Sequence, residues 1–78
     1  MRLLEAEKKE HDRQAVIDYQ RQAYECRRAF IEYPENELLR AAMQLSRKRA
    51  AKAYGKFVGK WEEEPVMPVY LEDQLEGF

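Results

Sequence analysis

Residues 15–61 read AVIDYQRQAYECRRAFIEYPENELLRAAMQLSRKRAAKAYGKFVGKW, and this stretch decides the fold. It is rich in Ala, Glu, Lys, Arg, Leu and Gln, which favour the helical state. Its only proline is Pro34, and its only glycines are Gly55 and Gly59 near its end. Because the residue before a proline is pushed out of the α region, the sequence predicts two long helices with a tight break at residues 33–36.

We expect these helices at about 4–33 and about 35–61, with Pro34 in the first turn of the second, where a missing N–H costs nothing. Two helices of similar length joined by a short loop favour an antiparallel pair. The predicted fold class is therefore all-α, with an antiparallel two-helix hairpin over residues 1–61. An extended C-terminal tail follows over residues 62–78, where Pro65 and Pro68 forbid a continuous helix.

The first predicted helix is apolar on two faces. One row of residues follows alternating steps of three and four, as a helix-packing seam does. Its members are Val16, Tyr19, Ala23, Cys26, Phe30 and Tyr33. A second row repeats every seven residues, lies about 100° further round the helix, and is separated from the first by Gln20 and Arg27. Its members are Ile17, Tyr24 and Ile31. The hairpin needs one face, so the other predicts a further contact.

The second predicted helix carries one long apolar row, formed by Leu39, Met43, Ala50, Ala53, Tyr54, Phe57 and Trp61. The whole chain has 78 residues, which is enough for one domain. A core of this size supplies only about 3–5 kcal/mol of stability. Cys26 is the only cysteine, so no internal disulfide can add to it. We therefore expect a homodimer in a four-helix arrangement.

The position of the charges is the strongest functional signal. Residues 38–61 hold seven basic side chains and no acidic one, whereas residues 62–78 hold six acidic side chains and no basic one. Four lysines in steps of four form a lysine stripe, which we place on the side of the helix opposite Phe57 and Trp61. The stripe consists of Lys48, Lys52, Lys56 and Lys60. It fits a solvated face, an acidic protein partner, the chain's own tail or a phosphate ligand.

Catalytic, metal and cofactor motifs are not found. His11 is the only histidine and lies in a polar run, and Ser46 is the only serine. No glycine-rich phosphate loop is present. We expect no enzyme activity, no cofactor and no metal site. The charged N-terminus and the lack of an apolar run near 18 residues predict no membrane segment and a cytoplasmic, reducing location.

We therefore interpret the chain as a protein–protein interaction module, an adaptor or an inhibitor that occludes a site on a larger partner. Small chains that act in this way include phage-encoded inhibitors of host machinery, a comparison of scale and not of sequence. The alternative is a nucleic-acid or nucleotide-phosphate binder that uses the basic second helix. The candidate binding residues are Ile17, Tyr24, Ile31, Arg47, Lys48, Lys52, Lys56, Lys60, Val69, Tyr70 and Leu71.

Overall fold

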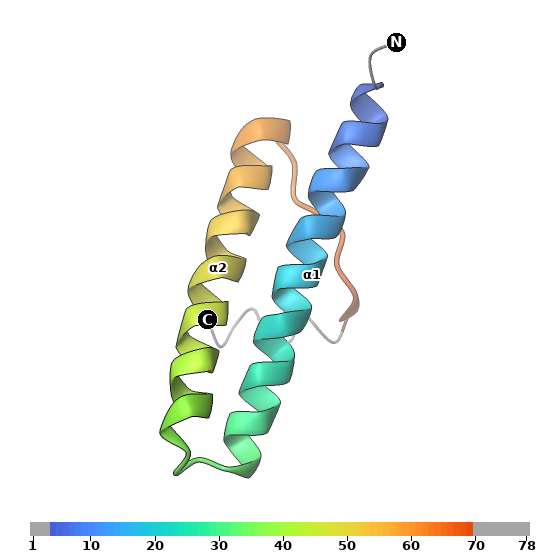
Figure 1. The fold of residues 1–78 in the computed structure, drawn as a ribbon. Coiled ribbons are helices and arrows are strands. Elements are labelled where there is room, and N and C mark those ends of the chain that lie inside the picture. Colours follow the sequence, from blue (N-terminus) through green and yellow to red (C-terminus); the bar gives the residue numbers. More distant parts are fainter. Residues whose placement is uncertain (1–3, 70–78) are drawn as a thin grey trace.

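The computed structural model describes residues 4–69, and over this range the chain forms two helices and no strand. Helix α1 spans Glu5–Glu32 and α2 spans Glu37–Trp61. They lie side by side and antiparallel, and the first turns of α1 extend beyond the end of α2 (Figure 1). The predicted all-α hairpin is confirmed, and α1 includes the polar residues 5–13.

The loop between the helices differs from the prediction. Pro34 lies in a turn outside both helices, and α2 begins only at Glu37. The reason is the Asn36 side chain, whose Oδ1 accepts a hydrogen bond of 3.1 Å from the backbone N–H of Leu39. This bond satisfies one of the N–H groups that the first turn of a helix leaves unpaired. Asn36, rather than Pro34, therefore fixes the start of α2.

The interface between the helices is built around small residues and one glutamine. Ala23 and Ala50 are completely buried, and the lack of longer side chains there lets the helices approach closely. Gln20, which the sequence analysis placed between two apolar rows, is buried at 1% exposure. Tyr19 and Tyr33, which it placed in the core, are exposed. The apolar seam therefore passes through Gln20, and Tyr19 lies at its rim.

Gln20 is only partly satisfied inside this interface. Its Nε2 donates to the backbone oxygen of Ala50 over 3.4 Å, whereas its Oε1 has no hydrogen-bond partner among the described residues. An unpaired buried polar atom costs roughly 1–3 kcal/mol, which exceeds the gain from one long hydrogen bond. The Ala50 oxygen lies inside α2 and already accepts the regular hydrogen bond of the helix, so the bond from Gln20 is an additional one and not its only partner.

We expect Gln20→Met to raise the free energy of unfolding by about 1 kcal/mol, because methionine fills the same space without the unpaired oxygen. Urea denaturation followed by circular dichroism measures the change. The matched variant Gln20→Glu places a carboxylate in the same position and should lose stability. A Gln20→Met chain less stable than wild type would show that the amide is needed for packing.

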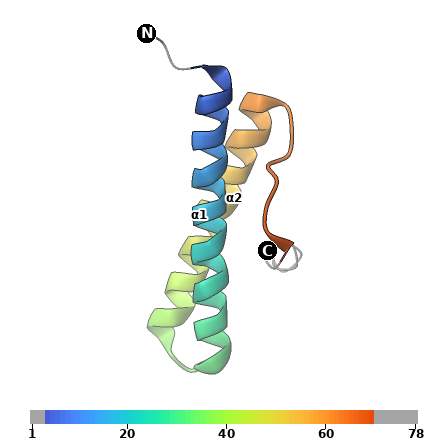
Figure 2. The same cartoon turned by 90° about the vertical axis from the view of Figure 1, so that its right-hand side faces the viewer.

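The C-terminal segment turns back over one face of the hairpin. Glu62, with a left-handed backbone (φ 53°), ends α2, and residues 62–68 then run without helix along the hairpin (Figure 2). Pro65 and Met67 are buried and Val66 is exposed, the alternation of an extended chain. Met67 forms the core cluster together with Val16 and Phe57. The segment is thus the third layer of a very small core.

Two carboxylates, those of Glu63 and Asp12, form the polar contacts that fix this end of the molecule. Glu63 forms ion pairs with Lys9 and with Arg13, the latter at 3.7 Å. Asp12 accepts hydrogen bonds of 2.9 Å from Lys60 Nζ and from Trp61 Nε1. The ion pairs of the C-terminal segment that involve described residues therefore go to α1 and not to the lysine stripe.

Candidate docking surface

The second apolar row of α1 is only partly free. Ile17 and Tyr24 are half-buried and pack against the cluster that contains Met67, so the chain's own segment covers part of this face. The Tyr24 hydroxyl also accepts a hydrogen bond of 3.2 Å from Arg28. Ile31 remains exposed at 62%. Two of the three members of this row therefore already contact the chain's own C-terminal segment, and binding of a further partner by this row stays a prediction.

The lysine stripe does not stay on one side of α2. A step of four residues turns the helix about 40° beyond a full circle, so the direction changes by about 120° between Lys48 and Lys60. Lys48 faces outward, whereas Lys60 reaches α1, where it binds Asp12 and lies 4.9 Å from the ring centre of Trp61. The placement of the whole stripe opposite the core is therefore wrong at its C-terminal end.

Three adjoining pockets, which together form a groove, lie between α1 and α2 on the side away from the C-terminal segment. This side faces the viewer in Figure 1, where the segment passes behind α1. We call it the groove face, and its depression near Tyr19 has a volume of about 310 Å³ and opens to solvent. Residues from both helices line it, among them Ala15, Tyr19, Gln22, Glu25, Cys26, Leu45, Arg49, Lys52, Ala53 and Lys56.

The two edges of the groove face carry opposite charge. On the α2 edge, Arg49, Lys52 and Lys56 are exposed, and within residues 4–69 they form no ion pair. On the α1 edge lie the exposed carboxylates of Asp18 and Glu25. Asp18 meets only its own helix, at 3.0 Å from Gln14 and 3.5 Å from Arg21. The groove is therefore polarised across its width, with an apolar floor between the edges.

Exposed apolar side chains gather at the loop end of the hairpin. Ile31 and Tyr33 at the end of α1 are each 62% exposed, and Leu38 at the start of α2 is 82% exposed. We call these three residues the loop-end patch. Sequence reasoning proposed only Ile31 of the three. The signal for the others was the tight turn itself, because a four-residue break brings the ends of both helices together.

The remaining candidate residues lie apart from these surfaces. Arg47 is half-buried on the outward side of α2 beside Lys48, and Val69 is exposed in the C-terminal segment. Tyr70 and Leu71 lie outside the described residues. The structure thus brings together Arg49, which the sequence analysis did not single out for binding, with Lys52 and Lys56.

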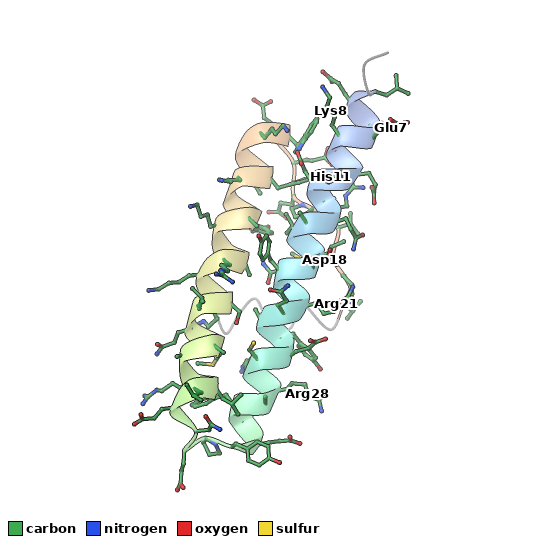
Figure 3. All side chains as sticks on the ribbon, viewed as in Figure 1. Glu7, Lys8, His11, Asp18, Arg21 and Arg28 are labelled. Atoms are coloured by element: carbon green, nitrogen blue, oxygen red, sulfur yellow. The ribbon has the colours of Figure 1, made fainter. Side chains whose placement is uncertain are left out.

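The charged side chains labelled in Figure 3 are spread along α1. They follow the helix from Glu7 to Arg28 without converging on one point. The His11 side chain is 87% exposed, with Asp12 at 3.7 Å. Among residues 4–69, no group of His, Cys, Asp and Glu could hold a metal ion.

The Asp12 carboxyl group has a perturbed pKa. Hydrogen bonds from Lys60 first and from Trp61 next lower the pKa of Asp12 below its ordinary value. A carboxyl whose pKa is lower in the folded state stabilises the fold at pH values above its unfolded pKa, near 4. This stabilisation is lost as the pH falls through the folded pKa.

We expect Asp12→Asn to be less stable than wild type at neutral pH, by about 1 kcal/mol, because the charged half of these contacts is removed. The difference should disappear as the pH falls well below about 4 and Asp12 becomes protonated. Urea denaturation of both chains over a pH series measures this. A difference that stays constant with pH would show that Asp12 acts only through its shape.

Neither helix in the described part of the chain is long and apolar enough to cross a membrane. Comparison with known proteins found no matching family model, no matching curated protein and no matching solved structure.

Proposed function

We propose that this chain is a small non-enzymatic protein–protein interaction module, an adaptor or an inhibitor that covers a site on a larger partner. The observation that carries the proposal is the loop-end patch, because Ile31, Tyr33 and Leu38 at the loop end of the hairpin are each largely exposed. Large apolar side chains exposed at one end of a molecule are a common feature of binding surfaces. A rigid hairpin presents such residues at little entropic cost.

We also propose that the chain acts as a homodimer. Among residues 4–69 the buried apolar residues are few, and the large ones in the core are Val16, Phe57 and Met67. Domains of this size bury too little surface for high stability by themselves. A second copy would add burial without any disulfide or metal.

The proposal is tested with a chain that carries Ile31→Asp and Leu38→Asp. These side chains are exposed, so the fold should be retained, and circular dichroism checks this. The control is Leu4→Asp, a change of the same kind at an exposed leucine at the opposite end of the hairpin. We expect the partner captured from the native cell extract by wild type and control to bind the double variant at least about tenfold more weakly. Equal capture by all three chains would contradict the proposal.

A second candidate function is phosphate binding by α2. The observation that favours it is that Arg49, Lys52 and Lys56 form no ion pair within residues 4–69. A salt titration with labelled oligonucleotides separates the two functions. Binding through phosphates weakens with a logarithmic slope of about −0.9 for each neutralised phosphate. Partner binding through the apolar loop-end patch responds much less to salt.

A further inference from the structure

We infer that the groove face is the surface on which a second copy of this chain docks, giving an antiparallel four-helix bundle whose twofold axis runs parallel to the helices. The inference rests on the proposed function only for the homodimer. It adds the face, the orientation and the charge pairs of that dimer.

The first support is the polarity of the groove. A uniformly acidic partner would meet Arg49, Lys52 and Lys56 on one edge, but on the other it would meet Glu25, which lines the groove, and the exposed carboxylate of Asp18, which pairs with Arg21. A partner with its own acidic and basic edges matches both. The chain itself has such edges, because Glu25 lines the groove on the α1 side and Arg49, Lys52 and Lys56 line it on the α2 side.

The second support is symmetry, because only one of two face-to-face arrangements matches unlike edges. A twofold axis across the helices would place α2 against α2, with lysines and arginines opposed, and like charges in direct opposition are unfavourable. An axis parallel to the helices places α1 of each copy against α2 of the other. Adjacent helices are then antiparallel throughout, as in a regular four-helix bundle.

The third support is the register. Gln20 lies level with Ala50, and Asp12 with Lys60, as their hydrogen bonds show. Asp18 is therefore level with Lys52 along the hairpin. Because a rotation about a parallel axis keeps this level, Asp18 would meet Lys52 of the second copy. By the same alignment, Glu25 would lie within about one turn of Arg49.

The fourth support is the shape of the surface. Ala15 and Ala53 form a floor of small side chains, and Tyr19 and Leu45 stand beside it, partly exposed at 39% and 49%. Small residues let a second pair of helices approach, and the two larger side chains supply apolar area to bury. The back of the hairpin offers less, since residues 62–68 already cross it (Figure 2).

The test uses two full-length variants in sedimentation velocity. The acidic-edge variant carries Asp18→Lys and Glu25→Lys, and the basic-edge variant carries Arg49→Glu and Lys52→Glu. Each should weaken self-association at least about tenfold, because like charges then face each other at both symmetric contacts. A one-to-one mixture should dimerise again as a heterodimer, because every contact then pairs opposite charges.

The control separates docking from general attraction between oppositely charged chains. A chain with Glu62→Lys and Glu64→Lys has the same net charge as the acidic-edge variant, but its changes lie in the C-terminal segment. It should not form a heterodimer with the basic-edge variant. Wild type that stays monomeric, variants that dimerise like wild type, or a control mixture that associates equally well would each overturn the inference. A monomeric wild type that still loses its partner through the loop-end variant would leave the interaction module itself intact.

Discussion

Replacing Phe57 with alanine is expected to unfold the chain. Phe57 is buried at 2% exposure and belongs to the only core cluster of the described residues, with Val16 and Met67. A buried Phe→Ala change costs roughly 3–5 kcal/mol. A core of this size supplies about the same free energy of unfolding in total, so the substitution removes the whole stability of the fold.

Far-UV circular dichroism at low micromolar concentration, followed by urea denaturation, measures this effect. The matched control is Tyr33→Ala, which removes an aromatic ring that is 62% exposed and should leave the unfolding midpoint unchanged. A Phe57→Ala chain that keeps full helicity and a cooperative transition close to that of wild type would show that the stability of the hairpin lies elsewhere.

Replacing Met67 with alanine is expected to release the C-terminal segment from the hairpin. Met67 is the side chain by which the segment enters the cluster, at 6% exposure. Its removal should cost about 2 kcal/mol, at the low end for a buried methionine, because a segment at the end of the chain can detach without unfolding the helices.

Trp61, the single tryptophan, reports this directly because it packs against the same cluster. We expect its fluorescence to shift to longer wavelength in Met67→Ala, together with a lower unfolding midpoint. The neighbouring change Val66→Ala, at a side chain that is 76% exposed, should alter neither. The same result in both variants would mean that the segment does not depend on Met67.

The hairpin could be predicted because its signals are local. Pro34 sets the break, and long stretches of helix-forming residues with a periodic apolar row set the two elements. Which residues of α1 face α2 was harder to predict. A heptad pattern admits either Tyr19 or Gln20, and the choice depends on packing against Ala50, which lies 30 positions away.

The surfaces were less predictable because they depend on tertiary contacts. Pro65 and Met67 lie in a segment without periodicity, so nothing in the sequence shows that it folds back over Ile17 and Tyr24. The sequence predicts that the lysine stripe lies on one side of α2. Steps of four residues turn its direction gradually, however, so that Lys60 reaches Asp12 on α1. The polarised groove appears only when the edges of both helices are compared.

The most direct test is the solvent exposure of methyl groups on the two faces, measured by NMR with a soluble paramagnetic agent on chains labelled at Met and Ala. We predict that Met67 is protected at every protein concentration, because the chain covers it itself. The agent should broaden the methyl signals of Ala15 and Ala53 at low protein concentration. At high protein concentration these methyls should be protected, because the second copy then covers the groove face. An exposed Met67, or alanine methyls whose exposure does not change with concentration, would contradict the division into one face covered by the chain and one face covered by its copy.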